Sequence, residues 1–313
     1  MIHLASFDLI ILFFILGILA SWLGSDLAVP DQVSKFLSIF LLLSLGLKGG
    51  HEVRMAEDLS GFVSSFSIGF ASCLALPAVL FFALKSYLGV PNASALAASY
   101  GSVSAVTFIT ARGVLESEGI ASSGYMVAIM ALMEIPAIVT AIYFYQSATR
   151  RGLAKRSAVL SVFSSKSVVL LMGGFAIGLS LNDVSWMGVA PVVQGAFKGV
   201  LAFFLLDMGV VAQRQLREAW RFKLFAMLIA FGVPLLVGSI ALIAGSILGL
   251  PHGDRILMAV LVGSASYIAA PATVRSAMPE ANPGLYLALP LALTFPMNLL
   301  FGIPFYIELS QIL

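Results

Sequence analysis

Charged side chains are scarce in this sequence. They make up 10% of its 313 residues, whereas 60% of the residues are hydrophobic. The mean hydropathy is +1.04, and soluble domains rarely exceed about half apolar residues. The composition therefore excludes an ordinary soluble domain. It predicts an all-α protein that crosses the membrane many times, because helices satisfy their own backbone hydrogen bonds in lipid.

Cysteine and histidine are also rare. The one cysteine, Cys73, lies inside an apolar run, which excludes an intrachain disulfide and a thiolate metal site. The three histidines, His3, His51 and His252, are too scattered to ligate one metal ion. No nucleotide-binding loop or catalytic triad is visible. We expect no enzyme activity, no cofactor and no nucleic-acid partner.

What the sequence has is long apolar segments. A membrane-spanning helix needs about 20 mostly apolar residues, and short connections join the segments. The first is too long for the apolar core of a signal peptide, so we interpret it as a span. The ten predicted spans are residues 6–24, 33–48, 61–87, 93–112, 122–146, 164–182, 194–213, 222–249, 254–275 and 284–311.

The basic residues predict the orientation. With ten spans both termini lie on one side of the membrane. Twelve of the 17 lysines and arginines lie on the opposite side. The five on the side of the termini are Lys48, Arg54, Arg112, Lys198 and Arg255. Cytoplasmic loops carry the excess of Lys and Arg. We therefore expect a multi-pass protein of the inner (plasma) membrane with both termini outside.

The two halves of the chain resemble each other. "GSVSAVTFITARGVLESEG" at Gly101 matches "GSASYIAAPATVRSAMPEA" at Gly263, and weaker matches precede and follow at nearly the same shift. Each half holds five spans, an odd number, so the second half enters the membrane in the opposite orientation. This predicts two inverted five-helix repeats, residues 1–150 and 164–313, joined by a short basic cytoplasmic linker, residues 151–163.

Small and polar residues interrupt spans 4 and 9 at matching positions, 101–107 and 263–273. A break at membrane depth survives only inside protein or beside a wet cavity. Two crossed breaks direct two half-helix N-termini at one spot, which suits an anion without a lysine or arginine. The alternative is that small residues only allow close helix packing. The predicted substrate-binding residues are Gly101, Ser102, Val103, Ser104, Ser264, Ala265 and Ser266.

Two acids fall well inside spans. Glu134 lies in the middle of span 5, just before Pro136, and could bind Na⁺ or carry a proton; a structural hydrogen bond is the alternative. Asp207 in span 7 is a secondary candidate that could instead serve helix packing or an interface. Arg112 and Arg275 follow the breaks and are expected as helix-end anchors or entrance rims. The predicted cation-binding residues are Ser104, Thr107, Glu134, Tyr267, Thr273, Thr294 and Asn298.

Four stretches, "YGSVSAVTF", "MEIPAIVTAI", "GSASYIAAPATVR" and "MPEANPGLY", resemble the sodium-dependent bicarbonate transporter family first recognised in cyanobacteria. The resemblance covers nearly the whole chain. It implies crossed broken helices and Na⁺-driven uptake of bicarbonate by an elevator-like movement. It also implies a homotrimer and a small trimeric regulator that binds from the cytoplasm.

This chain departs from the cyanobacterial pattern at two positions. Tyr267 stands where that pattern has an acid, and Ala272 replaces the second of two prolines, the first being Pro271. The expected function is Na⁺-dependent bicarbonate uptake. The alternatives are Na⁺- or H⁺-coupled transport of another small anion or carboxylate, and a channel or sensor without coupled transport.

Overall fold

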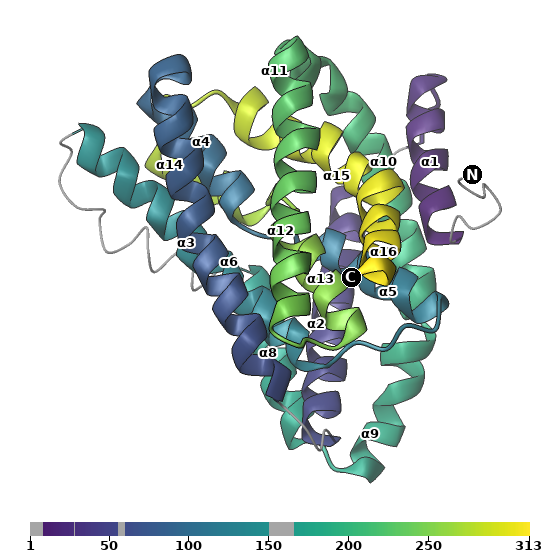
Figure 1. Ribbon diagram of the computed structural model, residues 1–313. Coiled ribbons are helices and arrows are strands. Elements are labelled where there is room, and N and C mark those ends of the chain that lie inside the picture. The colour runs from purple at the N-terminus through teal and green to yellow at the C-terminus, as the bar shows by residue number, and fades with distance from the viewer. Residues whose placement is uncertain (1–8, 28, 56–59, 150–165) are drawn as a thin grey trace.

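The computed structural model of the chain describes residues 9–27, 29–55, 60–149 and 166–313 (Figure 1). This part of the chain is helical and contains no strand, so the predicted all-α class is confirmed. The predicted linker, residues 151–163, lies outside the described residues.

The helices of the first half follow one another with short connections. They are α1 (Leu9–Trp22), α2 (Asp31–Met55), α3 (Ser60–Leu88), α4 (Val90–Gly101), α5 (Ala105–Ser117) and α6 (Tyr125–Thr149).

The second half contains longer composite helices, in which π-helical turns (η) join α-helical pieces. The first of these elements are α8 (Lys166–Ser180), α9 (Asp183–Ala190), η2 (Pro191–Gly195), α10 (Phe197–Trp220), α11 (Lys223–Met227), η3 (Leu228–Gly232) and α12 (Val233–Ile247). The rest are α13 (His252–Val262), α14 (Ala269–Ala277), η4 (Gly284–Ala288), η5 (Pro290–Thr294), α15 (Phe295–Met297), η6 (Asn298–Gly302) and α16 (Ile303–Ile312).

Several of these helices are long and apolar enough to cross a membrane. Among the described residues there are seven candidate spans: Asp31–Met55, Ser60–Leu88, Val90–Ser117, Tyr125–Thr149, Asp183–Trp220, Lys223–Ile247 and Gly284–Ile312. Two shorter apolar helices, Ile11–Trp22 and Val168–Ser180, accompany them. The chain is therefore a multi-pass helical membrane protein, whereas the count of ten stays a prediction. The predicted span 61–87 agrees closely with α3. The predicted span 33–48 ends too early, because α2 continues to Met55.

Four helices form two tightly packed pairs, α1 with α10 and α2 with α8, which we call the paired-helix group. Glycines make the close approach possible. A Cβ atom at Gly17 would lie 2.1 Å from the carbonyl oxygen of Leu206, and one at Gly209 would lie 2.2 Å from that of Phe14. A Cβ at Gly50 would likewise lie 2.1 Å from the carbonyl oxygen of Phe175. Small residues at such contacts let helix backbones touch in lipid.

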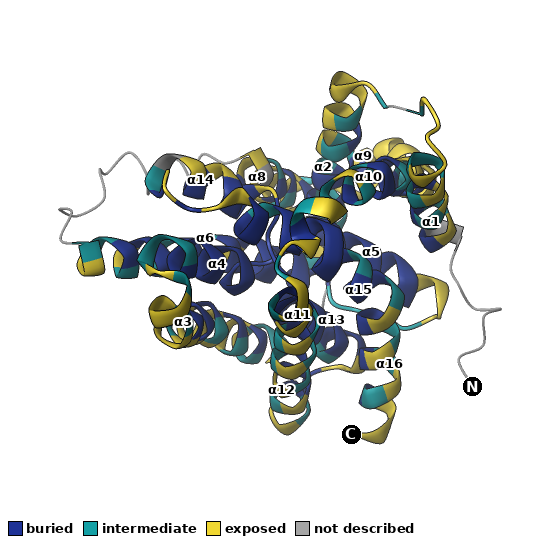
Figure 2. Cartoon of the chain, turned by 90° about the horizontal axis from the view of Figure 1, so that it is seen from above, coloured by how far each residue is buried: buried dark blue, intermediate teal, exposed yellow. Residues whose placement is uncertain are grey.

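Helices α3 to α6 and α12 to α16 form a second group, which we call the broken-helix group. In it α3 packs on α4 and α6, and α12 packs on α13. The interrupted helices α4, α5 and α13 lie in the buried centre, while α3, α12 and α16 carry exposed side chains on the outside (Figure 2). Exposed apolar residues such as Val63, Val79 and Ile240 suit a surface that faces lipid tails.

The two ends of the bundle differ in charge. Arg214, Arg217, Arg221 and Lys223 gather where α10 ends and α11 begins. We call this end, where α11 lies in Figure 1, the basic face. The start of α2 lies beside α10, where Asp31 and Ser34 neighbour Asp207. The chain ends at the opposite face, where the Ser246 hydroxyl donates to the Leu313 carbonyl at 3.3 Å.

Candidate functional site

The first predicted break is present between α4 and α5. Residues 102–104 leave the helix, and Ser104 caps α5 by accepting a hydrogen bond of 3.2 Å from the Thr107 N–H. A serine hydroxyl competes with the helical carbonyl for backbone donors, which favours a break and a new start here. Gly101 lies against Pro77 of α3, because a Cβ there would be 2.3 Å from the proline ring.

The second predicted break separates α13 from α14. The Ser264 hydroxyl donates to the Leu261 carbonyl at 2.8 Å, and the Ser266 hydroxyl accepts from the Ala270 N–H at 3.1 Å. Ser104 and Ser266 occupy the same position after Gly101 and Gly263. Ser104 is the N-cap residue of α5, whereas Ser266 lies two residues before the N-cap position of α14, Ile268. Both hydroxyls bond a first-turn N–H of the half-helix that follows.

The two breaks bond to each other. The Ser104 N–H donates to the Ser264 hydroxyl at 2.9 Å, and the Ser266 N–H donates to the Ser99 carbonyl at 2.8 Å. All of these groups are buried. The breaks form one crossing, as predicted, but several N–H groups that the sequence leaves free for a ligand are used within the protein.

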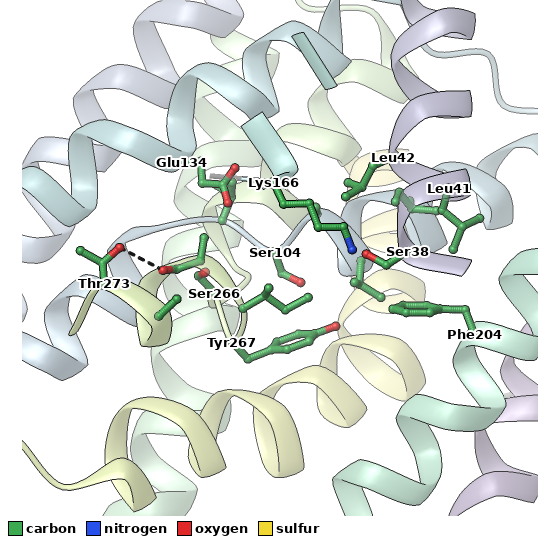
Figure 3. Close-up of a pocket in the computed structure, with 17 residues that line it drawn as sticks. Ser38, Leu41, Leu42, Ser104, Glu134, Lys166, Phe204, Ser266, Tyr267 and Thr273 are labelled. Atoms are coloured by element: carbon green, nitrogen blue, oxygen red, sulfur yellow. Dashed lines mark hydrogen bonds between the residues drawn. The ribbon is translucent and has the colours of Figure 1, made fainter. Parts of the chain in front are cut away.

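A cavity of about 350 Å³ lies at this crossing, between the two helix groups (Figure 3). The broken-helix group contributes the start of α5, Glu134 of α6 and residues 266–269, 272 and 273. The paired-helix group contributes Ser38, Leu41 and Leu42 of α2, Lys166 of α8 and Phe204 of α10.

Six of the predicted site residues line this cavity: Val103, Ser104, Glu134, Ser266, Tyr267 and Thr273. Glu134 is 5% exposed and its side chain reaches the cavity from the middle of α6 (Figure 3). Tyr267 is 6% exposed, and its hydroxyl lies on the cavity wall without a well-formed hydrogen bond among the described residues. The crossing therefore carries the carboxyl of Glu134 and the phenol of Tyr267.

The other predicted residues lie behind the wall and hold the crossing in place. The Ser102 hydroxyl donates to the Glu134 carbonyl at 3.1 Å, and the Asn298 amide donates to the Gly263 carbonyl at 2.8 Å. The hydroxyls of Thr294 and Tyr100 share a hydrogen bond of 2.7 Å. The residues outside the cavity wall are Gly101, Ser102, Thr107, Ser264, Ala265, Thr294 and Asn298.

Asp207 also lies outside the cavity. It is 5% exposed on α10 and has Ser34, Asp31 and Arg214 as electrostatic neighbours. This position within the paired-helix group fits the packing interpretation of Asp207 better than a role at the crossing.

Lys166 is a cavity residue that sequence reasoning missed. The sequence predicted an anion site without a lysine, yet Lys166 begins α8 and lines the cavity, and its ammonium group donates to the Lys35 carbonyl at 3.3 Å. The sequence feature that could have pointed to Lys166 is its position at the start of a predicted span. A second hollow of about 270 Å³ adjoins the cavity and adds Ser34, Lys35, Met208, Val211 and Leu291. The first two lie at the start of α2, and Met208 and Val211 lie farther along α10 than Phe204, so the cavity leads toward the basic face.

Ion pairs join the two groups beyond the opposite end of the cavity. Arg112 of α5 pairs with Glu52 of α2, and Lys48 of α2 pairs with Glu116 of α5. The Arg112 side chain is 4% exposed, and its Nε lies 3.6 Å from Glu116. Arg112 is therefore not an exposed helix-end anchor but a buried link between α2 and α5.

A comparison with protein families finds one match over nearly the whole chain. The model of the Na⁺-dependent bicarbonate transporter superfamily matches residues 10–311. No curated protein matches the chain.

Proposed function

This chain belongs to the Na⁺-dependent bicarbonate transporter superfamily, and we propose that it takes up bicarbonate together with Na⁺. The observation that carries the proposal is the cavity at the crossing of two capped half-helices, with the buried carboxyl of Glu134 in its wall. An intramembrane acid beside such a break is the arrangement by which secondary transporters couple an ion to a substrate.

The anion is proposed to bind at the first turns of α5 and α14. Ala105, Val106 and Ala269 line the cavity in those turns, and the positive ends of both helix dipoles lie there. The amides of Ser104 and Ser266 bond across the crossing, which leaves these first-turn amides as the donors for a small planar anion. The hydroxyls of Ser104 and Ser266 fix where the two turns begin.

Sodium is proposed to bind beside Glu134. The carboxyl oxygens of Glu134 and the hydroxyls of Thr273 and Tyr267 line the same cavity, and broken helices supply backbone carbonyls nearby. Thr107, Thr294 and Asn298 support this arrangement from behind the wall instead of binding the ion. Tyr267 replaces a charged ligand by a neutral one.

The whole chain is proposed to be two inverted repeats of five spans. The seven candidate spans, the two shorter apolar helices and the interrupted α13–α14 together make ten segments. Exchange of the two halves turns the α1–α10 pair into the α8–α2 pair, and glycine contacts occur in both. In both halves a serine three residues after the glycine accepts from a first-turn N–H of the next half-helix.

The basic face is proposed to be cytoplasmic, with both termini outside the inner membrane, because basic residues favour the cytoplasm. The cavity then faces the cytoplasm, and the Arg112 ion pairs close the outer side. An elevator movement of the broken-helix group along the paired-helix group would expose the cavity outside. A homotrimer and a small trimeric cytoplasmic regulator are proposed from the family resemblance.

A second candidate is H⁺-coupled transport of another small carboxylate. It is favoured by the buried Glu134, which could carry a proton, and by Tyr267, which leaves the cavity with fewer charged ligands for Na⁺. Dependence on Na⁺ separates the two candidates.

Uptake of labelled inorganic carbon into proteoliposomes tests the proposal, at a pH where bicarbonate dominates. We expect accumulation that needs an inward Na⁺ gradient and is lost in Glu134→Gln. Accumulation driven by a proton gradient alone would support the second candidate. Equilibration without accumulation would contradict coupled transport and indicate a channel.

A further inference from the structure

A fixed positive charge lies in the wall of the cavity. Lys166 lines both the cavity and the adjoining hollow, and its ammonium group is turned toward Ser38 of α2 (Figure 3). The amine also bonds the Lys35 carbonyl at 3.3 Å. Lys166 is exposed at the start of α8, where the cavity leads to the basic face.

A carboxyl and an amine share the wall of the cavity. Among the 17 described residues that line it, Glu134 supplies a carboxyl and Lys166 supplies an amine. Glu134 is buried, whereas Lys166 is exposed at the mouth of the cavity. A cation bound at Glu134 offsets the repulsion between an ionised carboxyl and an anion, and leaves the attraction of the Lys166 ammonium group. Cation binding at Glu134 therefore favours anion binding near Lys166.

The two charges come from different helix groups. Glu134 belongs to α6 of the broken-helix group, whereas Lys166 belongs to α8, which packs on α2. A movement of one group along the other therefore separates the cavity from Lys166. The lysine contributes to anion binding in the conformation described here, in which the cavity leads to the basic face, and not in one open to the other side.

We propose that Lys166 is the counter-charge of the transported anion at the basic-face mouth of the cavity. This inference rests on the proposed function. It adds that Lys166 makes the anion affinity depend on the position of the broken-helix group. The sequence predicted an anion site without a lysine, whereas here the anion is bound by two half-helix N-termini and by the Lys166 ammonium group.

Restoring the charge chemically tests the role of Lys166. In Lys166→Cys, alkylation with 2-bromoethylamine rebuilds an ammonium side chain, whereas iodoacetamide adds a neutral group. Cys73 is fully buried and donates to the Met133 carbonyl at 3.1 Å, so it is shielded from both reagents. Lys85→Cys is the matched control, because Lys85 is exposed and lies 4.6 Å from the Phe82 ring, away from the cavity.

The readout is bicarbonate affinity by calorimetry of the purified, full-length protein in saturating Na⁺. Lys166→Cys is expected to bind about tenfold more weakly, the size of a lost charge-assisted hydrogen bond. Bromoethylamine should restore the affinity and iodoacetamide should not. Lys85→Cys should bind like the wild type. Unchanged affinity in Lys166→Cys, or equal effects of the two reagents, would overturn the inference.

A different result is expected if bicarbonate is not the transported anion. Wild-type protein that binds formate or acetate but not bicarbonate would contradict bicarbonate transport, and the Lys166 series with that anion would still decide the inference. Folded wild-type protein that binds none of the three anions would contradict both.

Discussion

The backbone N–H of Ser104 donates a hydrogen bond of 2.9 Å to the hydroxyl of Ser264, and the two residues are 160 positions apart in the chain. Each belongs to a different interrupted helix. The bond satisfies a buried donor that the break would otherwise leave without a partner, and it locks the two breaks together at the cavity.

Removal of this hydroxyl should destabilise the crossing. In Ser264→Ala the buried N–H of Ser104 loses its acceptor, so we expect a loss of about 1–3 kcal/mol in the free energy of unfolding. Thermal unfolding in detergent measures the change. Ser67→Ala is the control, because its exposed hydroxyl bonds only the Val63 carbonyl of its own helix. Equal melting temperatures for both variants would contradict the role of the crossing bond.

The two intramembrane acids should differ in importance. Glu134→Gln keeps the shape of the side chain but removes the charge in the cavity, so Na⁺-driven uptake should fall to background while expression stays intact. Asp207→Asn should cost less, because Asp207 lies outside the cavity wall. Initial uptake rates in proteoliposomes give the order. A larger loss in Asp207→Asn would show that the coupling ion binds elsewhere.

A large side chain in place of Ser104 should block the cavity. Ser104→Leu extends an apolar side chain into the space between the half-helices, so bicarbonate binding should become undetectable by calorimetry. Ser104→Ala loses the same cap, at about 1 kcal/mol, but adds no bulk and should retain most of the binding. If the two variants bind alike, the anion does not occupy this cavity.

The ion pairs between α2 and α5 should hold the outer side closed. Arg112→Gln removes the buried partner of Glu52, so the opposite face should open more often. A Ser38→Cys reporter in the cavity should then react faster with a membrane-impermeant thiol reagent added from that face. Arg255→Gln is the control on the same face, because Arg255 bonds Ser246 and the Ser310 carbonyl within the broken-helix group. Unchanged labelling would show that these pairs do not gate the cavity.

The sequence alone determined the class of the protein and the places where its helices break. Hydropathy is a local property, and so is the preference of Gly101, Ser102 and Ser104 for a break followed by a cap. The repeat placed Ser264 and Ser266 at the matching position. For the same reason Glu134 could be singled out, because a carboxyl in the middle of an apolar segment is visible without any structure.

Only the tertiary structure decided how these pieces meet. The Ser264 hydroxyl accepts from the Ser104 amide across the crossing, Lys166 enters the cavity from another helix pair, and Arg112 is buried against Glu52. Each of these contacts joins residues far apart in the chain, so no local pattern encodes it. The packing of one helix group on the other selects which polar side chains line the cavity and which support it from behind.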